Sequence, residues 1–391
     1  MTHLLPGLIG AFMVLFGALL YVVFDGYLRV LRLACRFTPH RGGVEYEVAT
    51  GAPLVTICVL ITVHNEAQQI VARVQNVLSQ DYPAELLEVV IASDGSTDDL
   101  ESVVTENFGD QVRVIHSELQ VGKSTMQNRA LESIQSSVVQ FTDAATRFAP
   151  GFLREIAKPF ADERVGAVQA HLLFVPRDPS TGPVSQARYW RAELEIRQLE
   201  DRLGILAVTS GACVAMRREL WRPLDPAFGE DCIIPLDVIL QSRKVVYAAA
   251  AIAHELEGEE FENVVKSRTR MTLRNWQATW SRSELLNPFA HPGYALALWS
   301  HKLLRWLTPV WLLGLSLSAL ALPLVSSRRL FLLPAGAVLA FYLLALVGGL
   351  AKAKGARVPV CASIYAFILA NLGFLGGLIQ AARGHTITRY R

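Results

Sequence analysis

The sequence predicts an α/β fold: one domain with a Rossmann-like, mostly parallel sheet, flanked by transmembrane helices. Three observations support this prediction. The 391-residue chain is 52% hydrophobic with a mean hydropathy of +0.31, more apolar than an ordinary soluble domain. Long uncharged runs lie near both ends, and a charged stretch of domain size separates them. Within that stretch, short β-branched runs alternate with helical patterns.

The N-terminal apolar run covers residues 4–24 and is uncharged until Asp25. It is long enough to cross a hydrocarbon core about 30 Å thick. A cleaved signal peptide has a basic segment before a shorter apolar run, whereas only Thr2 and His3 are polar before this one. We therefore expect a retained transmembrane helix within residues 1–28.

Three more uncharged runs near the C-terminus predict about three further transmembrane helices. The segment before them carries Trp299 and Trp306 among cations, which is typical of an interfacial amphipathic segment. The expected parts of the chain are a first helix at 1–28, a cytosolic α/β domain at 41–288, an interfacial segment at 289–306, membrane helices at 307–382 and a basic tail at 383–391.

The distribution of basic residues predicts the orientation of the chain in the membrane. Four arginines follow the first apolar run and almost nothing basic precedes it, so the middle domain is expected in the cytosol of a multi-pass inner (plasma) membrane protein. With four crossing helices, Lys352 and Lys354 are also cytosolic, but the basic tail lies outside, against the rule. Either the last helix does not fully cross or the tail is an exception, and the sequence leaves both open.

Within the middle domain, residues 54–63 form a continuous β-branched run, typical of a strand buried on both faces. Further strands are expected at 87–92, 111–116 and 137–141, with helices between them. Ligands bind beyond the carboxyl ends of parallel strands, so polar residues at those ends are site candidates. They are His64, Asn65 and Glu66 after the first strand, Asp94 after the second and Asp143 after the fourth.

Glycine-rich phosphate loops do not follow these strands, and the run from Gly122 to Ser124 is too short to be one. Strand ends that carry carboxylates favour a metal site or contacts with a base and a ribose. The net charge is only +2, from 37 Lys and Arg against 35 Asp and Glu. A nucleic-acid partner is therefore not expected.

Six short motifs occur in an order that resembles the family 2 glycosyltransferases of the membrane-integrated bacterial type, which have a GT-A fold. The resemblance covers about residues 54–280. The motifs are residues 62–66, 93–98, 122–123, 142–145, 210–212 and 229–231.

The resemblance implies a role for each motif. Nucleotide-sugar binding is implied for His64, Asn65, Glu66, Asp94, Lys123, Asp143 and Arg270. The acceptor side is implied for Ser210, Gly211 and Glu230, and Asp231 is the expected general base. Asp143 is the expected ligand of a Mg²⁺ or Mn²⁺ cofactor.

The implied activity is an inverting transfer of sugar from a UDP- or GDP-linked donor to a lipid, a lipid-linked saccharide or a growing glycan, with membrane lipids as further partners. The chain departs from the family pattern at two places. Ala145 stands where the metal motif Asp-x-Asp has its second aspartate, and residues 267–271 keep only Arg270 of the Gln-x-x-Arg-Trp motif of processive members. A catalytically impaired nucleotide-sugar-binding scaffold, a processive polysaccharide synthase and a transporter with a regulatory domain are the alternatives.

Single residues also have structural interpretations. Asp94 and Asp143 are residue types that cap helices and turns, and Glu66 suits the first turn of a helix. The basic face that Arg270 shares with Lys266 and Arg274 suits anionic headgroups as well as a diphosphate.

Overall fold

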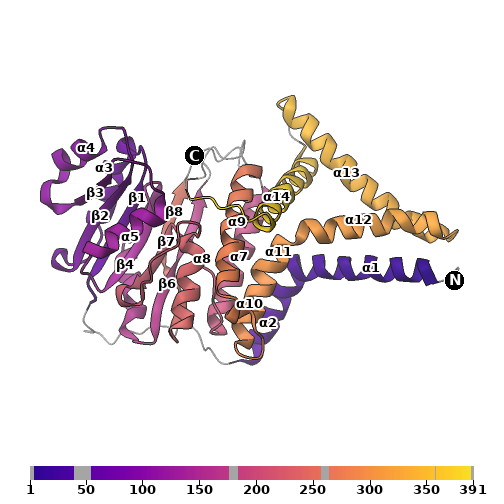
Figure 1. The fold of residues 1–391 in the computed structure, drawn as a ribbon, viewed down its shortest axis with the longest axis horizontal. Helices are drawn as coiled ribbons and strands as arrows, with labels where there is room; N and C mark the ends of the chain where they lie inside the picture. The colour runs from indigo at the N-terminus through magenta and orange to yellow at the C-terminus, as the bar shows by residue number, and fades with distance from the viewer. Residues whose placement is uncertain (1–3, 39–53, 176–183, 257–263, 357, 389–391) are drawn as a thin grey trace.

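The computed structural model describes residues 4–38, 54–175, 184–256, 264–356 and 358–388 of the chain (Figure 1). An α/β domain occupies one end of the molecule, and apolar helices from both ends of the chain project from the other. The first helix and the C-terminal helices lie together although almost the whole α/β domain separates them in the sequence.

The α/β domain is built on an eight-stranded sheet with the order β3-β2-β1-β4-β7-β6-β8-β5. The block β3-β2-β1-β4 is parallel, β7 is antiparallel to β4 and β6, β8 is parallel to β6, and β5 is antiparallel to β8. The sheet is therefore parallel in its first half and mixed in its second. The strands are β1 Ile57–Val63, β2 Leu87–Asp94, β3 Arg113–Ser117, β4 Val138–Asp143, β5 Thr146–Phe148, β6 Val165–Val175, β7 Cys213–Arg217 and β8 Lys244–Leu256.

Helices cover both faces of this sheet. Alternate residues of β1 enter two separate cores: Val59 and Ile61 pack beneath α3, α4 and α6, whereas Cys58 and Leu60 pack beneath α5 and α8. Because both faces of β1 are buried, its sequence is a continuous apolar run without alternation. The helices of this domain are α3 Ala67–Leu78, α4 Leu100–Phe108, α5 Lys123–Ser133, α6 Phe152–Ala157, α7 Val184–Arg202, α8 Glu230–Leu240 and α9 Val264–Ser281.

Four helices of the described residues are long and apolar enough to cross a membrane. The first is continuous over Leu4–Phe37 and contains α1 Leu4–Tyr21, a π-helical turn η1 Val22–Gly26 and α2 Tyr27–Phe37. The others are α12 Thr308–Val325, α13 Leu332–Ala353 and α14 Pro359–Ala382. The expected interfacial segment contains α10 Pro292–Ala297, a second π-helical turn η8 Leu298–Leu303 and α11 Leu304–Trp306.

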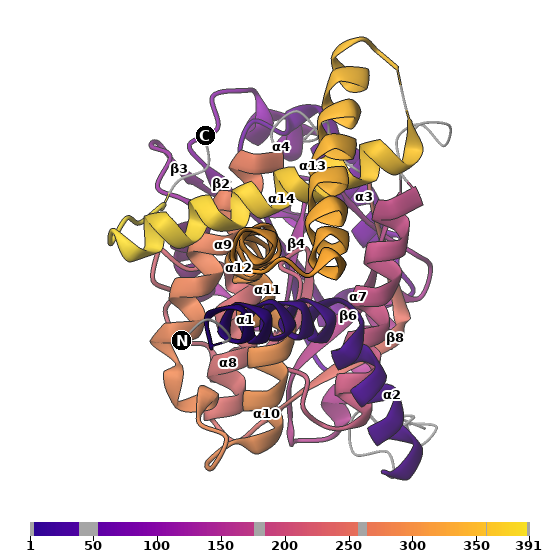
Figure 2. The same cartoon turned by 90° about the vertical axis from the view of Figure 1, so that its right-hand side faces the viewer.

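These four helices do not share one direction. Helices α1 and α12 pack side by side and point away from the sheet (Figure 1). In the perpendicular view, α12 is seen end-on and α1 is foreshortened, while α14 runs crosswise above them (Figure 2). Helix α14 packs along α9 of the α/β domain, so it is part of the junction between the domain and the other long apolar helices.

A buried polar cluster lies at the same junction. His301 of η8 is fully buried, with Nδ1 2.9 Å from Glu200 Oε1 and Nε2 2.9 Å from Glu193 Oε1. The Tyr27 hydroxyl donates to Glu200 at 2.8 Å, and Arg305 donates to Glu193 at 2.6 Å. The cluster thereby joins α2, α7, η8 and α11.

Candidate active site

The parallel block of the sheet brings the predicted strand-end residues to one edge. Thr62 pairs with Asp143, and Val63 pairs with Ser93, so the ends of β1, β2 and β4 are level. His64, Asp94 and Asp143 consequently stand at neighbouring strand ends. This edge is where an open parallel sheet binds its ligand.

Hydrogen bonds between the first two strand ends form a rigid framework. His64 Nδ1 lies 2.7 Å from the carbonyl oxygen of Asp94. Asn65 has a positive φ of 56°, and its Oδ1 accepts the amide N–H of Thr97 at 2.8 Å. Asp98 accepts the amide N–H of Ala67 at 2.9 Å. These contacts fix the loops after β1 and β2 against each other before any ligand is present.

Asp94 organises the turn that begins α5. Its Oδ1 accepts the amide N–H groups of Val121 at 2.6 Å and Gly122 at 2.9 Å, and Oδ2 accepts that of Gly122 at 3.0 Å. Gly122 has φ +100°, a conformation that L side chains rarely adopt. The buried carboxylate of Asp94 thus holds a glycine turn at the N-terminus of a helix.

Lys123, the first residue of α5, connects two carboxylates from different parts of the sequence. Its Nζ lies 2.6 Å from Asp143 Oδ1 and 2.5 Å from Glu230 Oε1. The Lys123 side chain is 15% exposed, that of Glu230 4% and that of Asp143 34%, so Asp143 is the most accessible of the three. The expected donor residues and the expected acceptor residues therefore meet at Lys123.

Glu230 and Asp231 begin α8 and have opposite pKa shifts. Burial by itself raises the pKa of Glu230, but the neighbouring charge and hydrogen bond of Lys123 lower it below the ordinary value. Burial and the adjacent Glu230 raise the pKa of Asp231, while Lys302, Arg274 and Lys123 partly oppose the rise. Asp231 is thus the more basic carboxylate of the pair, as a general base requires.

Glycines make room for both carboxylates. A Cβ on Gly211 would lie 2.6 Å from Glu230 Oε1, and one on Gly229 would overlap Oδ1 of Asp231. Ser210, beside Gly211, donates its amide N–H to Gln169 Oε1 at 2.6 Å, and the Thr209 hydroxyl donates to the Asp231 carbonyl at 2.8 Å. The loop before β7 is therefore shaped around the start of α8.

Two cations near Asp231 were not assigned to this site from the sequence. Arg274 of α9 is buried and donates to the Phe228 carbonyl at 2.5 Å and to Ser124 Oγ at 3.2 Å. Lys302 belongs to η8 and is the strongest positive influence on Asp231. Arg270, the predicted diphosphate contact, lies one helical turn before Arg274 on α9. The i, i+4 spacing in the basic face of α9 was the available signal for Arg274.

Asp143 is the partly exposed carboxylate at this edge that the sequence predicts as a metal ligand. The described residues contain no group of three or more His, Cys, Asp or Glu side chains arranged to hold one. Asp143 can supply one ligand, and the phosphates of a bound donor can supply others, which is a common arrangement for Mg²⁺. Burial, Asp98 and Asp143 raise the pKa of Glu66, so negative charge already accumulates here. The site therefore fits a cation that arrives with its ligand.

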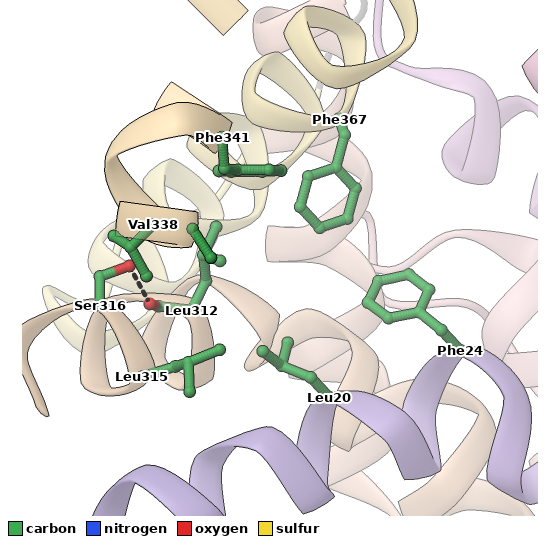
Figure 3. Close-up of a pocket in the computed structure, with 9 residues that line it drawn as sticks. Leu20, Phe24, Leu312, Leu315, Ser316, Val338, Phe341 and Phe367 are labelled. Carbon is green, nitrogen blue, oxygen red and sulfur yellow. Dashed lines mark hydrogen bonds between the residues drawn. The ribbon is translucent and has the colours of Figure 1, made fainter. Parts of the chain in front are cut away.

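An apolar cavity of about 350 Å³ lies among the long helices, apart from the polar edge of the sheet (Figure 3). The side chains of α1, η1, α12, α13 and α14 that line it are mostly aliphatic or aromatic. The Ser316 hydroxyl lies 2.8 Å from the Leu312 carbonyl and 3.0 Å from the Tyr342 hydroxyl, so its hydrogen-bonding capacity is already used. The lining residues are Leu20, Phe24, Leu312, Leu315, Ser316, Ala337, Val338, Phe341 and Phe367.

The sheet, the level strand ends and the two carboxylates at the start of α8 define a glycosyltransferase with a GT-A fold. Residues 53–272, more than half of the chain, match the family described as glycosyltransferase like family 2. The chain belongs to this family, which confirms the fold class and the enzyme class predicted from the sequence.

Similar proteins include an uncharacterized protein, a β-monoglucosyldiacylglycerol synthase and a hyaluronan synthase. An uncharacterized protein of Mycobacterium tuberculosis is 27% identical over 68% of this chain and 85% of its own length. A β-monoglucosyldiacylglycerol synthase of Nostoc is 26% identical over 51% of this chain and 45% of its own length. A hyaluronan synthase of Streptococcus pyogenes is 29% identical over 49% of this chain and 46% of its own length. The match thus spans about half the length of these two synthases.

Among solved structures, a mannosyltransferase of Pyrobaculum calidifontis in complex with GDP-Man and Mn²⁺ has a similar fold. The TM-score is 0.70, with 20% sequence identity over 95% of this chain and 99% of the other. The likeness therefore extends beyond the α/β domain to the helices at both ends.

Proposed function

We propose that the chain transfers a sugar from a nucleoside-diphosphate sugar to the hydroxyl of a lipid or lipid-linked acceptor at the membrane surface, with inversion at the anomeric carbon. The observation that carries this proposal is the contact of Lys123 with both Asp143 and Glu230. It joins a site suited to a diphosphate and a cation with a site suited to proton removal from an acceptor.

The donor half of the proposal rests on the strand ends. His64, Asn65 and Asp94 form a fixed edge for the base and ribose, while Gly122 and Lys123 begin a helix whose N-terminus favours phosphate. The complex of the similar mannosyltransferase with GDP-Man supports this assignment. Either a uridine or a guanosine donor is compatible with these residues.

The acceptor half rests on Asp231. In the proposed reaction Asp231 takes the proton of the acceptor hydroxyl, and the hydroxyl oxygen forms a bond to the anomeric carbon. The bond from that carbon to the diphosphate oxygen breaks, and the nucleoside diphosphate leaves with the electron pair. A single displacement of this kind inverts the anomeric configuration. The raised pKa of Asp231 makes it a stronger base than an ordinary aspartate.

Cations in the site offset the charge of the leaving diphosphate. Lys123 and Arg274 supply this charge from the protein, with Arg270 as a further candidate on α9. Asp143 is the residue that would hold Mg²⁺ or Mn²⁺, and such an ion would neutralise charge on the diphosphate. The Mn²⁺ in the similar mannosyltransferase supports the use of a divalent ion.

A lipid acceptor is supported by the surroundings of the site. Long apolar helices adjoin the α/β domain, and the cavity between them is suited to a hydrocarbon chain. A related synthase is named for a glucosylated diacylglycerol. The basic residues after the first helix support a cytosolic α/β domain in a multi-pass inner-membrane protein.

The test is a screen of the purified full chain in lipid nanodiscs with labelled UDP- and GDP-sugars. We expect one donor to give label in the lipid extract, in a sugar of inverted anomeric configuration by NMR. A long labelled polymer would instead identify a processive synthase. Donor binding without turnover, with several lipid extracts tried as acceptors, would identify a scaffold.

A further inference from the structure

The end of the described chain returns to the donor edge of the α/β domain. After α14 ends at Ala382, the segment continues beside α9 toward the sheet (Figure 1). The carbonyl oxygen of His385 accepts Nε2–H of Gln277 at 2.8 Å. The carbonyl oxygen of Thr388 then lies so close to Gly122 that a Cβ on that glycine would overlap it. Residues more than 260 positions apart in the sequence thus meet at one turn.

The turn that this segment touches belongs to the proposed donor site. Gly122 is held by Asp94, and the next residue, Lys123, pairs with Asp143 and Glu230. Under the proposed function, this is where the diphosphate binds. The segment 385–388 therefore lies at the edge of the diphosphate site, where the backbone of Thr388 contacts the backbone of Gly122.

The packing of α14 explains how the segment is held there. Three glycines of α14 face α9, because a Cβ on each would meet α9 atoms: Arg268 from Gly373, and Thr269 and Thr272 from Gly376 and Gly377. The Thr269 hydroxyl also donates to the Gly373 carbonyl at 3.2 Å. Small residues that allow close backbone approach mark an extended helix–helix interface. Helix α14 is thereby fixed to the α/β domain and lies across α1 and α12 (Figure 2).

We propose that residues 385–388 form a wall of the donor site, anchored by α14 lying along the membrane surface on the side of the α/β domain. The proposal rests on the proposed function for the identity of the donor. It also removes one exception to the positive-inside rule. If α12 and α13 cross out and back and α14 does not cross, Arg383 lies on the same side as Lys352 and Lys354, whereas Arg328 and Arg329 between α12 and α13 lie on the other side.

Kinetics of two variants test the wall. Truncation after Gly384 removes it, and Gly122→Ala displaces it. We expect each to raise the donor KM about tenfold, equivalent to about 1.4 kcal/mol of binding free energy. Because both changes act on the same contact, the donor KM of the double variant should be no higher than that of the more impaired single variant. Gly151→Ala is the matched control: Gly151 also has a positive φ, of 79°, but a Cβ there meets nothing within 4 Å. Additive effects, or an unchanged donor KM after truncation, would overturn the proposal.

Thiol labelling tests the position without relying on turnover. Thr388→Cys should react with a membrane-impermeant maleimide in inverted vesicles but not in intact cells, as should Gln111→Cys on the exposed surface of the α/β domain. Arg328→Cys, between α12 and α13, should show the opposite pattern. Unsubstituted chain gives the background from Cys232, because Cys35, Cys58, Cys213 and Cys361 are buried.

Protection from labelling by nucleotide then tests whether residues 385–388 line the donor site or only lie near it. UDP or GDP should slow labelling at Thr388→Cys and leave Gln111→Cys unchanged. Labelling of Thr388→Cys in intact cells would overturn the placement of α14, and equal labelling with and without either nucleotide would overturn the wall. Failure of the proposed function is distinguishable, because it would appear as no turnover with any donor while Thr388→Cys and Gln111→Cys still react from the same side.

Discussion

Lys123 Nζ lies 2.6 Å from Oδ1 of Asp143, so the residue proposed to hold the metal ion is already paired with a cation of the protein. A divalent ion that arrives with the donor must compete with this pair. The ion and Lys123 can share the charge of the diphosphate once it is bound, which removes the conflict.

Transfer activity should therefore require a divalent ion, and the site should bind that ion with low affinity. Excess chelator should abolish transfer, and Asp143→Ala should weaken donor binding as well as rate. Ala145→Asp restores a second carboxylate two residues after Asp143 and should lower the metal concentration that gives half-maximal rate. Titration of Mg²⁺ and Mn²⁺ against transfer rate measures this, and full activity in chelator would show that the protein's own cations suffice.

Asp231→Asn should lose about 10²–10⁴-fold in kcat, the usual cost of removing a general base. Nucleotide affinity should change little, because the donor residues lie on other loops. Asp143→Ala is the comparison, since it should impair nucleotide affinity too. If Asp231→Asn transfers sugar at near wild-type rate, the proton acceptor is another group, and Glu230 is the first to test.

The same Asp231→Asn variant should unfold at a higher temperature than the wild type at pH 7. Folding raises the pKa of Asp231, so the folded state favours the protonated carboxyl. The stability that this protonated form contributes is fully present below the ordinary aspartate pKa, and it is lost as the pH rises through the raised pKa. Asparagine stays neutral and avoids this loss. The advantage should disappear near pH 3.8, the ordinary aspartate value, and calorimetry across pH checks it.

The pH profile should move in opposite directions in two variants of residues around Asp231. The acid limb of kcat/KM reports the free enzyme's base. Glu230→Gln removes a negative neighbour that raises the pKa of Asp231, so the limb should move to lower pH. Lys302→Gln removes a positive neighbour that lowers it, so the limb should move to higher pH. If the acid limb of kcat/KM does not move in either variant, the limb reports the titration of a group other than Asp231.

The buried cluster around His301 should be essential for folding. Both ring nitrogens lie 2.9 Å from carboxylate oxygens, so the buried ring bridges Glu193 and Glu200. His301→Leu leaves Glu193 and Glu200 without this partner and should destabilise the chain by about 3–5 kcal/mol. Arg32→Ala is the control, because its bidentate pair with Glu195 is exposed and should contribute little. Equal stability of the two variants would contradict the prediction.

The sequence predicted the parts of the fold that depend on local pattern. The β-branched run that became β1, the strands that follow it and the residues at their ends are visible because burial on both faces leaves a continuous apolar signal. The start of the predicted strand at residue 54 was early, since β1 begins at Ile57. The antiparallel strand β7 and the long pair β6 and β8 were not predicted, and they make the second half of the sheet mixed.

Contacts between distant segments were beyond sequence reasoning. Arg274 of α9 and Lys302 of η8 lower the pKa of Asp231, and their positions depend on how those helices pack on the sheet. The apolar composition of α14 predicted its length but carried no information about its direction. The glycines at 373, 376 and 377 are the one signal in the sequence for its close packing against α9.

The shared position of Lys123 has a consequence for the order in which substrates bind. A donor diphosphate that draws Lys123 away from Glu230 leaves the negative charge of Glu230 less neutralised. Because Glu230 raises the pKa of the adjacent Asp231, the proton affinity of Asp231 then increases. The base therefore becomes strongest only after the donor is in place. An acceptor that arrives first meets a weaker base, so we expect sequential kinetics in which the nucleotide-sugar binds before the acceptor.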